Sequence, residues 1–263
     1  MRVHLVQSDI VWEDKPANHD RVRAMLKGVE IGGGDLIVLP EMFDTGFSLN
    51  VEATHDGGGE SAGFIRDLAR SHDAWAMGGI TIAGDRGAKA RNRALCFDPR
   101  GELAGSYDKL HPFSYGREGE RFEGGKSVGV VGWGTGGDLD ESLALCQTIC
   151  YDLRFPELYR AGLSKGAEAF AVIANWPDTR AFHWRALAIA RAIENQAYVF
   201  AVNRVGTDPV LGYAGGSIVV SPTGEVVAEA GADATVLSAD VEPGVVRSWR
   251  GTFPAWRDRR DDL

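Results

Sequence analysis

The sequence predicts an α/β fold in which sheets and helices form layers. Short runs rich in β-branched residues alternate with amphipathic stretches over most of the 263 residues, and 44% of the chain is hydrophobic. This alternation favours a layered α/β architecture over a helix bundle or a β-sandwich. A chain of this length and composition can bury a large core. We expect one domain over residues 1–263, with a C-terminal tail from about residue 245.

Eight apolar runs have the length and composition of β-strands. They are Val3 to Gln7, Leu36 to Leu39, Ala76 to Ile82, Val128 to Val131, Leu143 to Ile149, Ala169 to Ile173, Val199 to Asn203 and Ile218 to Val220. Amphipathic stretches at about residues 16–29, 61–71, 156–165 and 182–197 are expected to be helices. Asp98-Pro-Arg-Gly101 and Ser221-Pro-Thr-Gly224 separate β-like runs and predict turns.

The helix expected at 182–197 has the clearest periodicity. Its apolar residues recur at helical spacing, whereas Arg185, Arg191 and Glu194 lie away from the centre of the apolar stripe. The stripe consists of Ala186, Ile189, Ala190, Ile193 and Ala197. We expect this stripe to pack into the core.

The net charge and the N-terminal residues limit the classes of partner. A formal charge of −9 would repel phosphate backbones and anionic membrane surfaces, so neither nucleic acid nor a membrane is an expected partner. The first residues become polar too early for a signal peptide. No run approaches the about 20 apolar residues that cross a bilayer.

The three cysteines are too few and too irregularly spaced for a disulfide framework, which indicates a reducing cytoplasm. Cys146 and Cys150 have the spacing C-x3-C, and in a strand these positions lie about 13 Å apart. No matching Cys/His cluster is present elsewhere in the sequence. We therefore expect neither a metal nor an organic cofactor.

The first segment that could carry chemistry is Leu36-Ile-Val-Leu-Pro-Glu-Met-Phe. Its apolar strand ends at Pro40 and delivers Glu41 into the following loop. Open α/β sheets bind ligands beyond the carboxyl ends of their strands, so Glu41 could reach a substrate. An acid in this position can equally cap a helix or pair with a basic neighbour.

The second segment contains Lys109, between Tyr107 and a run that includes Phe113 and Tyr115. A lysine is usually a solvated surface charge. The aromatic neighbours favour partial desolvation, and a fixed ammonium there could stabilise a developing oxyanion.

The third segment is an alternating strand that stops at Cys150 and gives way to a helix near Pro156. Asp152 can accept hydrogen bonds from free backbone amides. Backbone N–H groups and a helix terminus favour thiolate at Cys150. Most isolated cysteines are inert core residues, and we expect Cys146 to be one of these.

Taken in order, Leu39-Pro-Glu41, Tyr107-Asp-Lys-Leu-His-Pro-Phe113 and Cys150-Tyr-Asp-Leu-Arg-Phe-Pro-Glu-Leu158 resemble the three catalytic segments of the nitrilase (carbon–nitrogen hydrolase) superfamily. Further matches at Ala174-Asn-Trp-Pro177 and Phe253-Pro-Ala-Trp256 extend the resemblance over nearly the whole chain. Within the superfamily the sequence is most similar to bacterial omega-amidases, which hydrolyse the terminal amide of 2-oxoglutaramate and 2-oxosuccinamate.

The resemblance implies a four-layer α-β-β-α sandwich that dimerises into an eight-layer assembly. It also implies that Cys150 is the nucleophile, Glu41 the general base and Lys109 the cation that stabilises the transition state. The backbone N–H of Tyr151 would complete the oxyanion site. A second glutamate typical of the family falls on Glu118, with Glu120 as the alternative.

An amide is a poor electrophile with a poor leaving group, so its hydrolysis needs a nucleophile, a proton shuttle and charge stabilisation. We therefore expect hydrolysis of a small amide through a cysteine thioester, with release of ammonia. A substrate carboxylate would need a cation. Arg154 is the candidate because it resembles the position at which carbamoylases of the superfamily place a carboxylate-binding arginine, although an arginine so close to a helix start can also be structural. The aromatic pocket walls are expected to be Phe43, Phe113, Tyr115 and Trp176.

Two alternatives remain open at this point. The same three residues could serve an N-carbamoyl amino acid, another aliphatic amide or a nitrile. The chain could instead be a non-catalytic member that binds a metabolite or a protein partner in the same cleft, or that uses its cysteine as a redox sensor. An intact Glu–Lys–Cys set argues against that second alternative.

Overall fold

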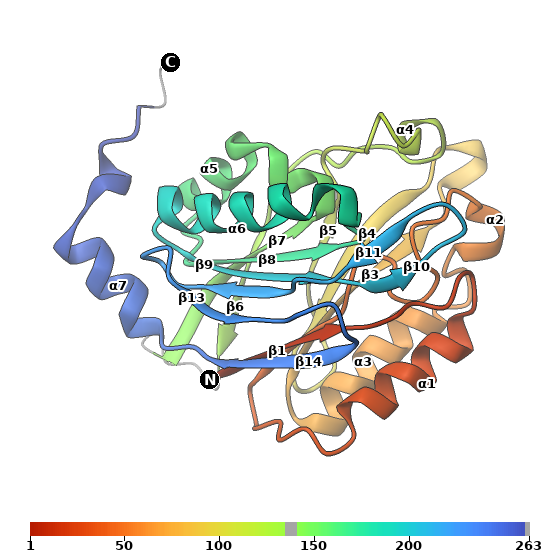
Figure 1. Cartoon of the computed structure of the whole chain (residues 1–263), viewed down its shortest axis with the longest axis horizontal. Coiled ribbons are helices and arrows are strands. Elements are labelled where there is room, and N and C mark those ends of the chain that lie inside the picture. The colour runs from red at the N-terminus through yellow and green to blue at the C-terminus, as the bar shows by residue number, and fades with distance from the viewer. Residues whose placement is uncertain (135–140, 261–263) are drawn as a thin grey trace.

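The computed structural model describes residues 1–134 and 141–260, and its framework is two six-stranded sheets (Figure 1). The first sheet contains, in spatial order, β14 (Thr235–Asp240), β1 (Arg2–Gln7), β2 (Leu36–Val38), β3 (Trp75–Ile82), β4 (Arg91–Phe97) and β5 (Leu103–Asp108). The second contains β13 (Val226–Glu229), β12 (Ile218–Val220), β9 (Tyr198–Asn203), β8 (Ala169–Ala174), β7 (Ser142–Ile149) and β6 (Val130–Gly134). In each sheet three central strands run parallel, and antiparallel strands complete both edges.

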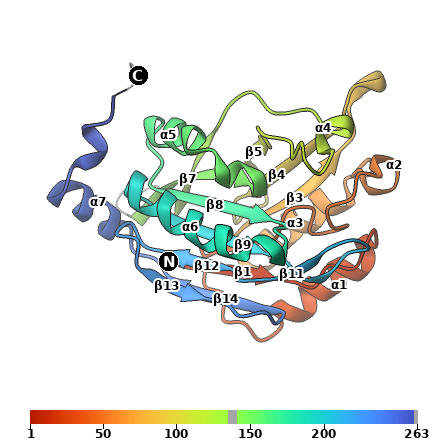
Figure 2. The ribbon, with the colours of Figure 1, turned by 45° about the horizontal axis from the view of Figure 1, so that its top comes forward.

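Helices cover the outer face of each sheet (Figures 1 and 2). The first sheet carries α1 (Lys15–Leu26) and α3 (Glu60–His72), and the second carries α5 (Pro156–Ser164) and α6 (Ala181–Asn195). The two inner faces share one core cluster, in which Val38 and Met77 of the first sheet join Leu145 and Ile173 of the second. The expected α/β fold, a four-layer α-β-β-α sandwich, is therefore confirmed.

All eight expected strands and all four expected helices are present, with ends displaced by at most three residues. The two predicted turns join β4 to β5 and β12 to β13, and each is closed by a glycine N–H that donates to a carbonyl, from Gly101 to Asp98 and from Gly224 to Ser221. Several elements were not among the expected ones, including β14 and the separate hairpin of β10 (Val205–Thr207) and β11 (Gly212–Ala214).

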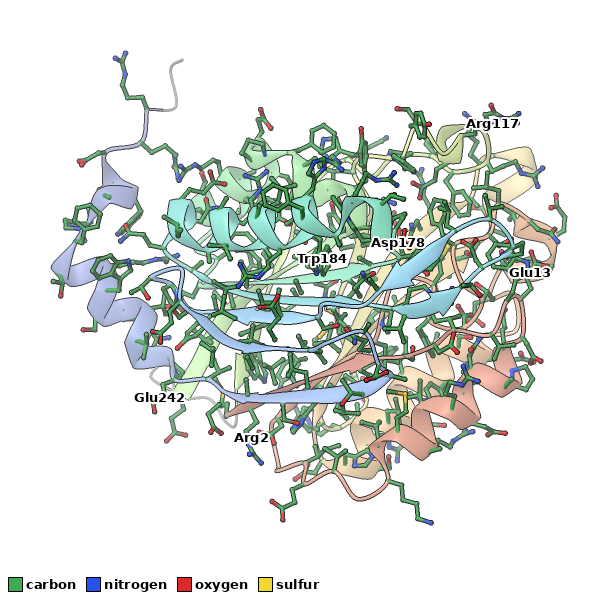
Figure 3. The ribbon with its side chains drawn as sticks, in the orientation of Figure 1. Arg2, Glu13, Arg117, Asp178, Trp184 and Glu242 are labelled. Atoms are coloured by element: carbon green, nitrogen blue, oxygen red, sulfur yellow. The ribbon has the colours of Figure 1, made fainter. Side chains whose placement is uncertain are left out.

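The expected apolar stripe of residues 186–197 packs into the core only in part: Ile189 contacts the core and Ala197 is fully buried, but the centre of the buried face of α6 lies elsewhere. Ile193 of that stripe is 52% exposed, and Ala186 is exposed as well. Arg191, placed away from the stripe, is buried instead and donates two hydrogen bonds to the carbonyl of Leu153. Trp184 lies on the same buried face, between α6 and the second sheet (Figure 3).

The segment from about residue 245, expected to be a tail, begins inside α7 (Pro243–Thr252). This helix lies at one end of the layers in both views (Figures 1 and 2). Arg250 of α7 donates to the carbonyls of Ala167 and Gln196, which ties the helix to the second sheet and to the end of α6. Within the two described ranges, every helix is too short or too polar to span a bilayer.

Candidate active site

The fold brings together the three residues expected to carry chemistry, from strand ends of both sheets. Glu41 follows β2, Lys109 comes directly after β5, and Cys150 comes directly after β7. All three side chains are buried, and Cys150, at 8% exposed, is the most accessible of them. A carboxylate, an ammonium and a thiol therefore meet in one place, although they are far apart in the sequence.

Lys109 lies between two buried glutamates. Its Nζ is 2.8 Å from Oε1 of Glu41 and 2.9 Å from Oε2 of Glu118. Glu118 begins the short helix α4 (Glu118–Arg121) and is fully buried, whereas Glu120 in the same helix is exposed and pairs with Arg117. Of the two candidates for the second glutamate, Glu118 is thus the one that lies in the site.

Two asparagines that the sequence did not single out hold these carboxylates in place. The side-chain amide of Asn92, on β4, donates to Oε1 of Glu41 at 2.7 Å and to Oε1 of Glu118 at 3.0 Å. The backbone N–H of Asn175, after β8, donates to Oε2 of Glu41 at 2.9 Å. Both oxygens of Glu41 therefore have donors, as a buried carboxylate requires.

The charge on Lys109 is stabilised by its neighbours. Burial alone would lower the pKa of Lys109, but the carboxylates of Glu118 and Glu41 and the nearby Cys150 outweigh it and raise the pKa well above its ordinary value. Lys109 is therefore an ammonium at neutral pH, held between two carboxylates.

Cys150 occupies a tight turn at the start of the 3-10 helix η3 (Cys150–Arg154). Its φ of +47° is in the left-handed region, which a residue with a β-carbon rarely adopts. Asp152 fixes this turn, because its buried carboxylate accepts from the backbone N–H groups of Ile149 and His111 and from the hydroxyl of Tyr107. The expected role of Asp152 as an acceptor of backbone amides is confirmed, and the turn is tied to the segment that carries Lys109.

The surroundings of the Cys150 thiol oppose the thiolate form that its turn was expected to favour. Burial raises the pKa of Cys150, the Glu41 and Glu118 carboxylates raise it further, and Lys109 opposes them only in part. Cys146 is fully buried in β7, and burial raises its pKa to about 12, in agreement with an inert core residue.

A glycine allows the two sheets to approach closely beneath the site. A β-carbon on Gly79 of β3 would lie 2.7 Å from Cδ1 of Ile173 and 2.9 Å from the Cα of Glu41. Both contacts are closer than van der Waals packing permits, and one of them is with backbone. The position of Glu41 therefore depends on the absence of a side chain at residue 79.

A cavity of about 350 Å³ opens above Cys150 and Lys109. The expected site residues Phe113, Tyr151, Arg154 and Trp176 all line it. Most of the remaining lining is apolar, which suits a small-molecule site with a few polar anchors.

Two of the expected aromatic walls were wrong. Phe43 is fully buried in the core between the first sheet and its helices, where its ring lies 5.7 Å from that of Phe64. Tyr115 is 86% exposed at the tip of the loop after Lys109. Phe47, which was not singled out in the sequence, is an aromatic residue of the cavity wall, and the Lys109 ammonium lies 5.2 Å from its ring centre.

No cluster of three or more His, Cys, Asp or Glu side chains suited to a metal ion occurs among residues 1–134 and 141–260. The polar groups at the floor of the cavity are the thiol of Cys150, the carboxylate of Glu41 and the ammonium of Lys109, and these groups suit nucleophilic catalysis. A thiol lies beside a carboxylate that can take its proton, and a fixed cation can stabilise negative charge on a carbonyl oxygen.

Proteins of known sequence and structure resemble this chain over its full length. Omega-amidase YafV of Escherichia coli (strain K12) is 36% identical over 260 residues, which cover 98% of this chain and 96% of that protein. A 2-oxoglutaramate amidase of Bacillus subtilis (strain 168) is 32% identical and covers 99% of this chain and 98% of its own length. The crystal structure of XC1258 from Xanthomonas campestris, a CN-hydrolase superfamily protein with an arsenic adduct in the active site, has a TM-score of 0.90 at 32% identity. That comparison covers 100% of this chain and 98% of the other.

The sequence pattern of the carbon-nitrogen hydrolase family matches residues 2–251. Together with the relatives above, this match shows that the chain belongs to the carbon-nitrogen hydrolase family.

Proposed function

We propose that this enzyme hydrolyses the terminal amide of a small carboxylate-bearing amide, 2-oxoglutaramate or 2-oxosuccinamate, to the acid and ammonia. The observation that carries the proposal is the buried Glu41–Lys109–Glu118 cluster beside Cys150 at the floor of a cavity. The names of the relatives from E. coli and B. subtilis support the choice of substrate.

In the first half of the reaction, Sγ of Cys150 attacks the amide carbon while Glu41 accepts the thiol proton. Because the pKa of the thiol is raised, proton transfer accompanies the attack. The Lys109 ammonium and the backbone N–H of Tyr151 stabilise the negative charge that develops on the carbonyl oxygen. Glu41 then protonates the leaving nitrogen, the C–N bond breaks, and ammonia departs from the thioester.

In the second half, Glu41 removes a proton from water as the water oxygen attacks the thioester carbon. The C–S bond breaks, the carboxylic acid is released, and the thiol regains its proton. Glu118 orients Lys109 throughout, since it holds the same ammonium from the opposite side. Arg154 binds the substrate carboxylate at the cavity wall, where an unpaired anion would be costly.

The test is ammonia release from 2-oxoglutaramate, simple aliphatic amides, an N-carbamoyl amino acid and a nitrile. Cys150→Ala should lower the rate by several orders of magnitude, as loss of a covalent nucleophile usually does, with an unchanged melting temperature. Cys146→Ala, four residues earlier and inside β7, is the matched control and should keep full activity.

Two outcomes would contradict the proposal. If 2-oxoglutaramate reacts no faster than simple aliphatic amides, the substrate is wrong. If wild type releases no ammonia from any compound, the non-catalytic alternative is favoured. Brief treatment with iodoacetamide then separates the cases, because only an accessible nucleophile at Cys150 is alkylated before Cys146 and Cys96.

We also propose that the protein acts as a homodimer in the cytoplasm. Free cysteines at positions 96, 146 and 150 suit a reducing compartment. Phe182 and Ile193 of α6 are large exposed apolar side chains, which a second subunit could cover. A single monomeric species in sedimentation velocity at micromolar concentration would contradict the dimer.

A further inference from the structure

Two arginines line the cavity wall, and within residues 1–134 and 141–260 neither forms an ion pair with an acidic side chain. Arg154 lies in η3, and Arg180 is the last residue of the 3-10 helix η4 (Asp178–Arg180). Arg154 contacts Nδ1 of His183 at 3.3 Å. Among the residues that the structure describes, no carboxylate forms an ion pair with either guanidinium.

Aromatic side chains hold both guanidinium groups against the wall. The Cζ of Arg154 lies 4.7 Å from the ring centre of Trp176, and that of Arg180 lies 5.6 Å from the ring centre of Phe113. Trp176 also donates from Nε1 to the backbone carbonyl of Arg180 at 2.8 Å, so one side chain supports both arginines. Asp178, at the other end of η4, lies next to Gly212 of β11, where a β-carbon on the glycine would be 2.8 Å from its Oδ2. Figure 3 labels Asp178.

The two positive charges interact with each other. Burial lowers the pKa of Arg154, and the neighbouring charge of Arg180 lowers it further. Of the described residues that line the cavity, Asp208 is the one with a carboxylate, and it already accepts from the N–H groups of Val210 and Leu211 and from the hydroxyl of Tyr213. A pair of like charges in a half-buried, mostly apolar site is stabilised when an anion binds between them.

We infer, on the basis of the proposed function, that Arg180 is a second substrate-binding cation and that it acts with Arg154 on a 2-oxo carboxylate. A simple carboxylate offers two oxygen atoms and is satisfied by one planar guanidinium fork. A 2-oxo carboxylate offers three oxygen atoms in a row, which suits two guanidinium groups. Arg180 therefore gives the enzyme its preference for amides that carry a 2-oxo acid over amides with a plain carboxylate or no charge.

The kinetic test compares three amides of the same chain length, namely 2-oxoglutaramate, glutaramate and the neutral pentanamide. Arg180→Gln should raise the KM for 2-oxoglutaramate by about 10- to 100-fold, the loss expected for one charged hydrogen-bonding partner. The KM for glutaramate should rise less, and kcat/KM for pentanamide should not change. Arg185→Gln, an exposed arginine of α6 outside the cavity, is the matched control and should behave as wild type.

A binding measurement separates this inference from the proposed function. The product 2-oxoglutarate should protect Cys150 of wild type from iodoacetamide, and Arg180→Gln should need at least about tenfold more of it for equal protection. Protection of wild type without turnover of 2-oxoglutaramate would reject the amidase proposal and leave the anion site standing. Turnover by wild type with no change in Arg180→Gln, or an equal loss on all three amides, would overturn the role of Arg180.

Discussion

Lys109 at the floor of the cavity and Arg180 at its wall are both cations of one site, yet their surroundings differ. Lys109 is fully buried and bonded to two carboxylates. Arg180 is half-buried beside the ring of Phe113, and no carboxylate in the described part of the chain forms an ion pair with it. The fold neutralises the floor cation before any ligand arrives, whereas the wall cation has its charge available for a ligand.

This difference separates catalysis from recognition. Groups whose charges are already paired inside the protein are held in a fixed arrangement, and such preorganisation stabilises a transition state without reorganisation during the reaction. A charged group without a partner inside the protein gains the most interaction free energy when a ligand of opposite charge binds. We call the cluster of Glu41, Lys109, Glu118 and Cys150 the floor of the cavity, and the two arginines Arg154 and Arg180 its wall. Substitutions in the floor should therefore mainly lower kcat, and substitutions in the wall should mainly raise KM.

The largest effect expected in this comparison comes from Glu118→Gln, which removes one of the two carboxylates from Lys109. We expect kcat to fall by roughly 100-fold or more, because the ammonium loses the partner that orients it. Glu120→Gln, two residues away in the same helix, changes an exposed side chain and should leave kcat unchanged.

A second readout distinguishes the role of Glu118 from a general loss of structure. Burial and Glu41 raise the pKa of Cys150, and Glu118 adds to this effect. Removing the Glu118 charge should lower that pKa, so the pH profile of Cys150 alkylation should move to lower pH. An unmoved profile with a lower kcat would mean that Glu118 is only structural.

Asn92→Leu tests whether the floor depends on neutral donors as well as on charge. The change removes both donors that Asn92 supplies to Glu41 and Glu118, and we expect kcat to fall by about 10- to 100-fold with little change in KM. Thr81→Val is the control, since Thr81 pairs with Asn92 across β3 and β4, and its buried hydroxyl has no hydrogen-bond partner among the described residues. Equal losses in the two variants would assign the effect to packing.

The floor could be predicted from the sequence more completely than the wall. Glu41 and Cys150 follow runs that were expected to be strands, so local sequence indicates both the strand and its end. Lys109 follows β5, which was not among the expected strands, and only the resemblance to a known family singled it out. Asn92 lies inside β4 between Arg91 and Arg93, and only the pairing of β4 with β3 places it near Glu41. Such long-range pairing has no local signal.

The direction in which a side chain points from a loop or helix was the other feature that could not be predicted from the sequence. Phe43 and Tyr115 follow Glu41 and Lys109 closely, but the direction of each is set by tertiary packing, toward the core in one case and toward solvent in the other. Tertiary packing also decides which face of α6 is buried, although the helix itself was predicted correctly from its periodicity. Its buried face includes Arg191, which donates to the carbonyl of Leu153, and this contact with a distant part of the sequence has no local signal.

Asp44 tests whether pairing, rather than burial, distinguishes the floor. It lies in the same loop as Glu41 and is as fully buried, but within residues 1–134 and 141–260 no cation forms an ion pair with it. Burial raises the pKa of Asp44 to about 6, against the opposing effect of a hydrogen bond from the Ser61 hydroxyl at 2.7 Å. Unlike the floor carboxylates, Asp44 thus has only neutral partners at hydrogen-bond distance.

Because the pKa of Asp44 is higher in the folded state, the protonated form favours folding. That stabilisation is fully present below the unfolded pKa of about 4 and is lost as the pH rises through about 6. Asp44→Asn keeps the side chain uncharged, so the variant should be more stable than wild type at pH 8, by up to roughly 3 kcal/mol. The difference should shrink towards zero near pH 4, as measured by urea unfolding.

The control for Asp44 is Asp56→Asn, which should have the opposite sign. The carboxylate of Asp56 accepts from the backbone N–H groups of Ser61 and Ala62 at the start of α3, so its loss should destabilise the protein by about 1 kcal/mol. If Asp44→Asn is also destabilising at pH 8, then a buried carboxylate in this loop is tolerated without a cation. Pairing with Lys109 would then not be what allows the floor carboxylates to be buried, and charge pairing would not explain the difference between the floor and the wall.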